Sequence, residues 1–163
     1  MLLRNAQIAD LPRIVEIYNA AIPGRQATAD TAPVTVASRE PWFREFDLQR
    51  RPLWLVERDA HICGWLSLRS FYGRPAYRAT VEAAVYTAPE VRRTGVGAAL
   101  LAHAIAAAPR LSIRTMLAFV FGHNAASLAL FRRFGFQDWG KLPQVAELDG
   151  VERDLLILGL KTG

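Results

Sequence analysis

The chain has 163 residues, enough for one hydrophobic core but not two, so residues 1–163 are expected to form a single domain. Hydrophobic residues make up 52% of the sequence and charged residues 21%, which excludes a disordered protein. The net charge of +5 suits an anionic ligand. No basic run is interleaved with aromatic residues, so nucleic acid is disfavoured as a partner.

Several features of the sequence favour the cytoplasm and exclude a membrane association. Polar residues interrupt the apolar Met1–Leu3 start too early for a signal peptide, and no apolar run reaches the roughly 20 residues that span a bilayer. The single Cys63 suits a reducing compartment and has no nearby base, so we expect a buried thiol and not an acyl-carrying nucleophile. The three His and one Cys lack ligand spacing, and no metal site is expected.

The amino-terminal part is predicted to contain a strand and two helices. Leu2–Asn5 has the pattern of a strand, and apolar residues at helical spacing predict a helix from Leu11 to Ala21 with Asp10 as its N-cap. Residues 22–36 carry prolines and a glycine among Ala and Thr, which indicates a loop. Ser38 is predicted to cap a second helix with aromatic residues on one side.

The middle of the chain is predicted to form three strands and one long helix. Leu53–Glu57 and His61–Arg69 have the pattern of a hairpin, and Thr80–Thr87 is rich in β-branched and small residues. An apolar stripe from Gly95 to Ala107 predicts the strongest helix of the chain, which Pro109 ends.

The carboxyl-terminal part is predicted to form a strand, a helix and a hairpin. Thr115–Phe121 is continuously apolar, as in a strand buried on both faces. Asn124 begins a helix, and Gly135 suits the left-handed position after its end. The hairpin turns at Asp149-Gly150, between Val145–Leu148 and Val151–Leu160. The order of elements predicts a mixed α/β (α+β) domain.

The segment from Arg92 to Gly97 lies between a predicted strand and the long predicted helix. Its two glycines allow close approach of a ligand, and successive amides at a helix N-terminus suit a pyrophosphate. The segment is not a Walker loop, which requires Gly-Lys-Ser/Thr, and its glycine spacing is too short for a dinucleotide fingerprint. The residues alone leave open a phosphate site or a tight turn.

Three segments together resemble one protein family. Arg92–Gly97 resembles the Gln/Arg-x-x-Gly-x-Gly/Ala signature of the GNAT superfamily of N-acetyltransferases. Ala76–Tyr86 is similar to a Tyr-Arg-x-Thr-Val-Glu-x-Ser-Val-Tyr strand of its phosphinothricin and methionine-sulfone acetyltransferases. Asn124–Leu128, with Phe134–Phe136 after it, resembles a helix of the same branch. The resemblance implies a central, mostly antiparallel twisted sheet with splayed middle strands and helices on both faces.

The resemblance also implies that acetyl-CoA is the acetyl donor and that it lies between the strands 80–87 and 115–121. Backbone groups at the end of the first strand would hold the pantetheine arm and the thioester, and the glycine-containing loop would hold the pyrophosphate. Asn124 would contact the donor, although a plain N-cap explains this residue equally well. The implied contacts are Val85, Tyr86, Thr87, Arg92, Arg93, Thr94, Gly95, Val96, Gly97, Ala98, Ala99, Asn124 and Arg133.

Glu82 is the candidate catalytic base. An amine must lose its proton before it attacks a thioester, and Glu82 is the only charged residue in its predicted strand. A structural ion pair with Arg78 or Arg74 is the alternative, and the resemblance favours the base. Arg74 and Tyr77 flank this strand and are candidate contacts for an acceptor that carries a carboxylate, although a solvated loop explains them equally well.

The sequence departs from the resembled branch at two places. Phe131 stands where many relatives place a Tyr or His that protonates the leaving thiolate, so another group or water does so, or the thiolate needs no proton donor, or activity is reduced. The carboxyl-terminal Lys and Trp of the branch are also missing, which leaves the acceptor open. Dimerisation is common in the branch, and the sequence does not fix it.

Three functions are therefore compatible with the sequence. The first is direct transfer of an acetyl group to the primary amine of a small molecule, such as phosphinothricin or methionine sulfone. The second is acetylation of a protein N-terminus or lysine, which requires a peptide groove. The third is a non-catalytic acyl-CoA-binding sensor, which Phe131 favours and Glu82 disfavours.

Overall fold

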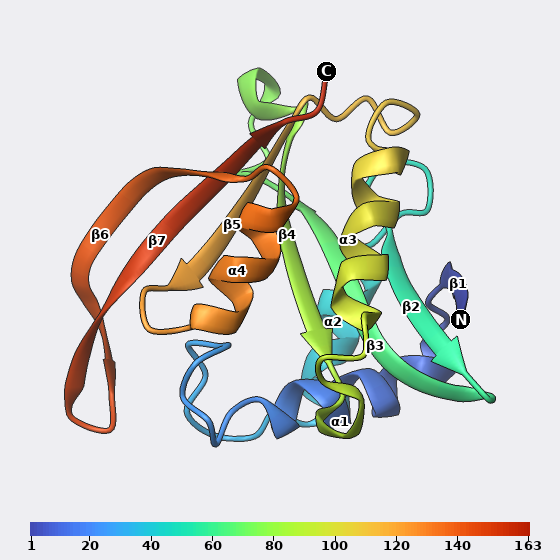
Figure 1. Ribbon diagram of the computed structural model, residues 1–163. Coiled ribbons are helices and arrows are strands. Elements are labelled where there is room, and N and C mark those ends of the chain that lie inside the picture. The colour runs from blue at the N-terminus through green and yellow to red at the C-terminus, as the bar shows by residue number, and fades with distance from the viewer.

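The computed structural model describes residues 1–163 and contains one seven-stranded twisted sheet (Figure 1). The strand order is β1-β2-β3-β4-β5-β7-β6. The strands are β1 (Leu2–Asn5), β2 (Leu53–Arg58), β3 (His61–Ser70), β4 (Thr80–Thr87), β5 (Thr115–Phe121), β6 (Gln137–Leu148) and β7 (Val151–Lys161). The helices are α1 (Leu11–Ala20), α2 (Val36–Arg44), α3 (Val96–Ala107) and α4 (Ala125–Arg133). The predicted order of elements is confirmed.

Every neighbouring pair of strands is antiparallel except β4 and β5, which are parallel and joined through α3. Parallel strands need such a crossover because a tight turn cannot join them. The β4–β5 pairing is short: it begins at Thr80 opposite Thr115 and ends at Glu82 opposite Leu117. Beyond this point the two strands diverge (Figure 1). The expected splay of the middle strands is confirmed.

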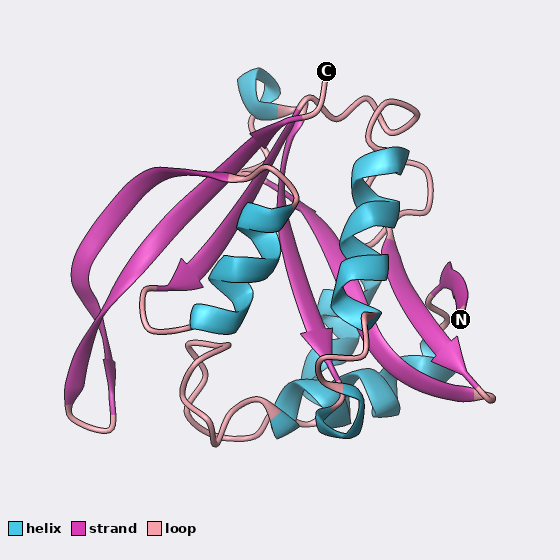
Figure 2. Cartoon of the chain, in the orientation of Figure 1, coloured by secondary structure: helices cyan, strands magenta, loops and turns pink.

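Helices cover both faces of the sheet, as expected (Figure 2). Along β4, Val81 and Ala83 belong to the larger core, which includes residues of α3 and α4. Successive side chains of a strand point to opposite faces. Tyr86 therefore packs on the other side, against the smaller core that Trp65 of β3 and Ile14 of α1 share.

The beginning of α3 lies very close to the sheet because Gly64 of β3 has no side chain. A Cβ at this position would lie 2.8 Å from Cγ1 of Val96 and 2.9 Å from the carbonyl oxygen of Tyr86. Gly97 allows a similar approach to α4, where a Cβ would lie 3.3 Å from Cδ2 of Leu130. These glycines fix the position of the loop between β4 and α3.

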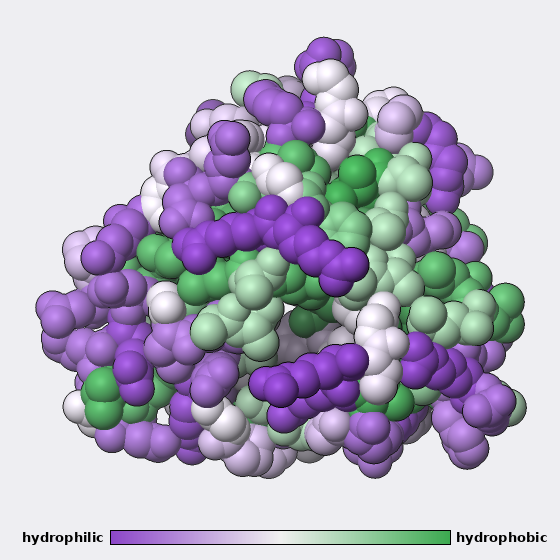
Figure 3. Space-filling view, in the orientation of Figure 1, coloured by the Kyte–Doolittle hydropathy of each residue, from purple (hydrophilic) through white to green (hydrophobic).

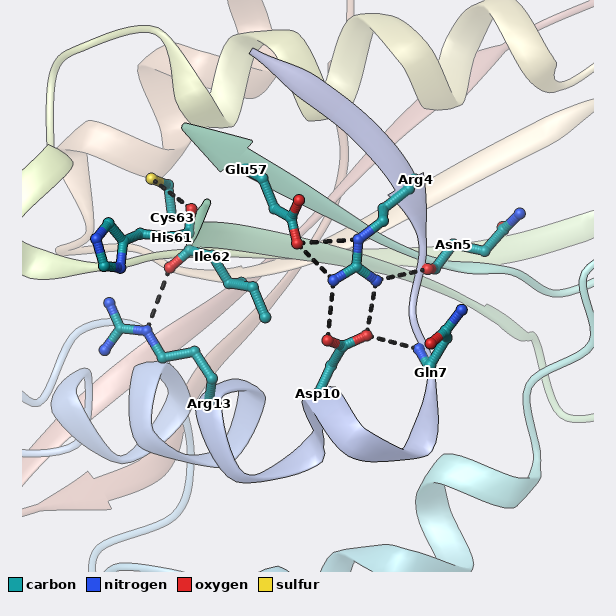
Figure 4. Close-up of polar contacts among 9 residues, drawn as sticks. All are labelled: Arg4, Asn5, Gln7, Asp10, Arg13, Glu57, His61, Ile62 and Cys63. Atoms are coloured by element: carbon teal, nitrogen blue, oxygen red, sulfur yellow. Dashed lines mark hydrogen bonds and ion pairs between the residues drawn. The ribbon is translucent and has the colours of Figure 1, made fainter. Parts of the chain in front are cut away.

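Arg4 joins β1 to β2 and to the segment before α1 (Figure 4). Its guanidinium donates to both carboxylate oxygens of Asp10, at 2.8 and 2.9 Å, and to Glu57. These bonds hold the pKa of the Asp10 carboxyl below its usual value. Asp10 is the N-cap residue of α1, as predicted. Its side chain makes no capping hydrogen bond to the helix, because the carboxylate accepts from Arg4 and from the backbone N–H of Gln7.

The cap of α2 differs from the prediction. Thr35 is the N-cap, and its hydroxyl accepts a hydrogen bond of 3.1 Å from the backbone N–H of Ser38. Ser38 returns the interaction through its own Oγ, which accepts from the backbone N–H of Thr35 at 3.2 Å. The predicted cap is therefore the third helical residue, and the helix begins at Val36. The two hydroxyl residues form a reciprocal capping box, which the sequence alone leaves ambiguous.

The carboxyl-terminal hairpin is longer than predicted, because β6 begins at Gln137 and not at Val145. Two irregularities in the pairing, after Asp138 and after Leu142, interrupt the alternation that identifies a strand. The turn at Asp149-Gly150 and the left-handed Gly135, with a φ of +91°, are confirmed. No helix of the structure is long and apolar enough to cross a membrane.

Candidate active site

The free edge of β4 begins where β5 leaves it. On one side β4 pairs with β3 as far as Thr87. On the other side its pairing with β5 ends at Glu82. Residues 83–87 therefore have an edge without a strand partner, and their polar backbone groups on that edge need another partner or water. The residues expected to hold the pantetheine arm lie on this stretch: Val85, Tyr86 and Thr87.

Four successive amides at the beginning of α3, Gly95–Ala98, make no hydrogen bond within the chain. Gly95 has a φ of +87°, which turns the backbone into the helix. The amide of Thr94 instead donates to the carbonyl of Val91, and that of Ala99 to the carbonyl of Gly95. The free donors and the positive end of the α3 dipole form an anion-binding arrangement.

Of the three arginines around this loop, one forms hydrogen bonds to the loop and two make no ion pair. Arg58 donates to the hydroxyl and carbonyl oxygens of Thr94, at 2.9 and 2.8 Å. Arg92 and Arg93 are exposed and make no ion pair. Figure 3 shows a hollow between α3 and α4, flanked by hydrophilic side chains, on the face that this loop borders.

A cavity of about 170 Å³ lies on the opposite face of the sheet, under α1 and α2. Its floor consists of three cross-strand pairs of β3 and β4. In order along β4 these pairs are Arg69–Glu82, Ser67–Ala84 and Trp65–Tyr86. The floor is therefore charged at one end, small in the middle and aromatic at the other end.

The walls of the cavity come from the two amino-terminal helices and from the loop between them. Tyr18 of α1 and Trp42 of α2 lie at the aromatic end, where the Trp42 and Trp65 ring centroids are 5.5 Å apart. Arg39 of α2 also lines the cavity. Its guanidinium carbon lies 4.8 Å from the centroid of the Tyr18 ring. The remaining wall residues are Ile14, Val15 and Val34.

Glu82 is the only carboxylate that lines this cavity, and it makes no hydrogen bond or ion pair within the chain. Burial raises the pKa of its carboxyl, and the positive charge of Arg69 offsets only part of this effect. The ion pair that the sequence suggested, with Arg78 or Arg74, is absent; the cation directly opposite is Arg69. A partly buried carboxylate with a raised pKa is suited to proton transfer.

A short segment, Arg25–Ala27, crosses the mouth of the gap between β4 and β5. Tyr86 from the end of β4 donates to the carbonyl of Ala27 at 3.0 Å. Asn124, after the end of β5, donates through Nδ2 to the carbonyl of Gln26 at 3.1 Å, and His123 contacts the carbonyl of Arg25 at 2.6 Å. Asn124 also caps α4 by accepting from the backbone N–H of Ser127. Both ends of the Asn124 amide are therefore engaged.

Other predicted residues lie apart from the cavity. Arg74 and Tyr77 are exposed in and beside a short 3₁₀ turn, with the Tyr77 ring 5.3 Å from that of Phe71. Arg133 is exposed at the end of α4. Phe131 is buried against Phe136 in the larger core and has no proton to donate.

The chain belongs to the acetyltransferase (GNAT) family, whose model matches residues 12–136. This assignment agrees with the splayed strands, the free amides at the start of α3 and the cavity beside the free strand edge. Members of this family transfer an acetyl group from acetyl-CoA to an amine, so the chain is an N-acetyltransferase of this type.

Particular relatives cover almost the whole chain. A Bacillus subtilis protein with a provisional name as a phosphinothricin acetyltransferase is 46% identical over 160 residues, 98% of both chains. The L-methionine sulfoximine/L-methionine sulfone acetyltransferase of Pseudomonas aeruginosa is 36% identical over 97% of this chain and 92% of its own. The crystal structure of a Sinorhizobium meliloti phosphinothricin acetyltransferase in complex with acetyl-CoA is 29% identical and superposes with a TM-score of 0.93 over 99% of this chain and 88% of that one.

The sequence did not reveal the walls of the cavity. Arg39 and Trp42 belong to a helix predicted only as a packing element, and Tyr18 to another. One signal was available in β3, where the polar Ser67 stands between apolar residues and is only 2% exposed. A buried hydroxyl in an apolar strand needs a partner or a cavity. The expected burial of Cys63, at 5% exposed, is confirmed.

Replacement of Glu82 by Gln should stabilise the protein at neutral pH. Because the folded pKa is raised, the unfolded chain loses its proton first as pH rises, which favours unfolding above the usual carboxyl pKa. The variant should therefore be more stable than the wild type near pH 7, and this advantage should shrink toward roughly pH 3. Denaturant unfolding at several pH values measures this difference in the free energy of unfolding.

The exposed Glu152, which makes no ion pair, provides the matched control, and Glu152→Gln should stay within about 0.5 kcal/mol of the wild type. A less stable Glu82→Gln at neutral pH would instead identify Glu82 as a structural partner of Arg69.

Proposed function

We propose that this N-acetyltransferase acts by direct transfer of the acetyl group of acetyl-CoA to the primary amine of a small acceptor that resembles an amino acid. The observation that carries the proposal is the Arg69–Glu82 pair in a small cavity beside the free edge of β4. The guanidinium of Arg69 is exposed and uses only Nη2 for its ion pair with Glu45, so its other donors suit the carboxylate of such an acceptor. The carboxylate of Glu82 suits the amine of the acceptor. The relatives' names, with amino-acid analogues such as phosphinothricin and methionine sulfone, support the same class.

The proposed binding site for acetyl-CoA has two parts. The free amides of Gly95–Ala98 bind the pyrophosphate, with Arg92 and Arg93 supplying positive charge. The unpaired edge of β4 at residues 85–87 holds the pantetheine arm through backbone hydrogen bonds. Asn124 contacts acetyl-CoA from the start of α4, which requires its hydrogen bond to the carbonyl of Gln26 to break. Arg133 adds positive charge at the end of that helix.

The chain's own groups perform two tasks in the reaction. Glu82 accepts the proton of the acceptor's ammonium group, directly or through water, which frees the nitrogen lone pair. A backbone N–H near Val85 stabilises the negative charge that develops on the thioester oxygen. Acetyl-CoA supplies an activated acetyl group, which passes from sulfur to the amine nitrogen. Phe131 has no proton to donate, so the leaving thiolate takes its proton from water.

The two other functions are less well supported. A protein N-terminus or lysine acceptor needs an open peptide groove, whereas the cavity beside Glu82 is small and bounded by α1 and α2. A non-catalytic sensor would retain the donor site but has no use for a destabilising carboxylate such as Glu82. Arg74 and Tyr77 do not line the cavity, and we retain them as proposed acceptor contacts only because they are exposed in the segment before β4.

Acetyl-CoA should stabilise the protein and should be consumed with amino-acid analogues. At 100 times its dissociation constant the stabilisation is about 2.7 kcal/mol, which a thermal shift detects. Gly95→Ala should weaken this shift because an alanine resists the left-handed backbone that aims the free amides. Gly73→Ala is the matched control, since Gly73 is also left-handed with no neighbour within 4 Å, and it lies far from the loop in sequence. The absence of any shift with the wild type would refute the donor.

Glu82→Gln should lower kcat/KM by roughly 10² to 10⁴, because the acceptor then keeps its proton. In the wild type the rate should rise with pH through a pKa above the ordinary carboxyl value. Thiol release, measured with methionine sulfone across a pH series, tests both points. A variant with the full wild-type rate at every pH would show that Glu82 is not the base.

We also propose that the protein is a cytoplasmic homodimer. The single cysteine supports the compartment. The hairpin of β6 and β7 forms one edge of the sheet and exposes large apolar side chains there, which supports association. They are Trp139, Leu142, Val145 and Val151. Light scattering should give about twice the chain mass of 18.1 kDa, and a monomer at assay concentration would contradict the proposal.

A further inference from the structure

If the proposed function holds, the order of the charged, small and aromatic pairs along the cavity floor restricts how an amino-acid acceptor can lie. Tyr86 lies four positions after Glu82, which corresponds to about 13 Å along the strand. The amine must reach Glu82, and the α-carboxylate is only one carbon away from the amine. Arg69, directly opposite Glu82, is then the partner of the α-carboxylate, through the donors that its ion pair of 3.1 Å with Glu45 leaves free. The acceptor's side chain then extends over Ser67 and Ala84 toward the aromatic end.

A second cation lines the cavity away from the Arg69–Glu82 pair. Arg39 lies over the ring of Tyr18, at 4.8 Å, and near the ring of Trp42, at 5.8 Å. Both rings belong to the aromatic end, because they neighbour Trp65 at 6.5 and 5.5 Å. The side chain of Arg39 is 26% exposed, so it is largely withdrawn from solvent.

Besides these two rings, one hydrogen-bond partner holds Arg39 in place, and its other donors stay free. Its Nη2 donates to Oδ2 of Asp30 at 3.0 Å. Tyr18 donates to the same carboxylate, and the hydroxyl of Thr28 accepts from the backbone N–H of Asp30. The Nε and Nη1 groups of Arg39 make no hydrogen bond within the chain. A guanidinium fixed in this way offers preorganised donors to a ligand.

We propose that Arg39 is a specificity-determining residue that binds an oxygen at the far end of the acceptor's side chain. Asp30 already balances one positive charge, so a neutral sulfone or phosphoryl oxygen is as suitable as an anion. The preferred acceptor is therefore an amino acid with a short apolar stem, which packs between the rings, and an oxygen-bearing tip. An amino acid with the same stem but no oxygen leaves the donors of Arg39 desolvated and unpaired, which lowers its reactivity.

The comparison of L-methionine sulfone with L-methionine tests this role, because the two share a stem and differ in the oxygens on sulfur. The measurement is kcat/KM by thiol release with acetyl-CoA. The wild type should prefer the sulfone, and Arg39→Gln should reduce the ratio of the two kcat/KM values by about tenfold or more. Arg44→Gln is the matched control, since Arg44 lies on the same helix, is 73% exposed and does not line the cavity. Its ratio should equal that of the wild type.

The ratio separates recognition from a merely structural effect. Loss of the Arg39–Asp30 pair through a structural role would lower both kcat/KM values together and leave their ratio unchanged, which would overturn the proposal. Arg39→Lys keeps the charge and should retain part of the preference, and it replaces the Gln variant if that one does not fold. A wild type that acetylates both amino acids without preferring the sulfone would refute the inference alone. A wild type that acetylates neither would refute the proposed acceptor class as well.

Discussion

The hydrogen bonding between β4 and β5 stops at Glu82 and Leu117, and the features of the site follow from this early end. Each strand keeps its other neighbour, so the sheet remains continuous while one internal edge of β4 opens. A parallel pair that continued would have used the backbone groups that the donor is proposed to bind. The divergence thus creates an unpaired edge in the middle of a sheet, where strands normally have partners on both sides.

Side chains take over where backbone pairing ends. Tyr86, His123 and Asn124 reach three successive carbonyls of Arg25–Ala27, so the loop after α1 is tied to both diverging strands. The same loop is tied to α1 and α2 through Asp30, and therefore to Arg39. The opening of the sheet and the wall of the cavity are held by one connected set of hydrogen bonds. A change in either is expected to affect the other.

The sequence was sufficient to predict those features that depend on residues close together in the chain. Apolar patterns and turn residues predicted the order of the helices and strands, although most of β6 was missed. The glycine-containing loop was visible because all its donors lie within a few residues. The sequence failed where a side chain has a choice of partners or where two residues compete for one role. The side chain of Asp10, at the N-cap of α1, could bond the helix or Arg4, and it binds Arg4 of β1. Thr35 and Ser38 both cap helices, and only the backbone conformation separates them. The cavity walls were not predictable, because Tyr18, Arg39 and Trp42 meet only after the sheet and helices have packed.

The energetic position of Glu82 explains why this part of the fold requires such support. A carboxylate that is largely withdrawn from water and has no hydrogen-bond partner destabilises the folded state, and Arg69 compensates only in part. The two neighbours of Glu82 in the strand are buried: Val81 and Ala83 are 0% and 3% exposed. Their packing against the larger core holds the carboxylate at the end of the β4–β5 pairing despite its cost. The stability that Glu82 removes is thus supplied by the opposite face of the same strand. Along β4, side chains that line the cavity therefore alternate with side chains that pack against the larger core.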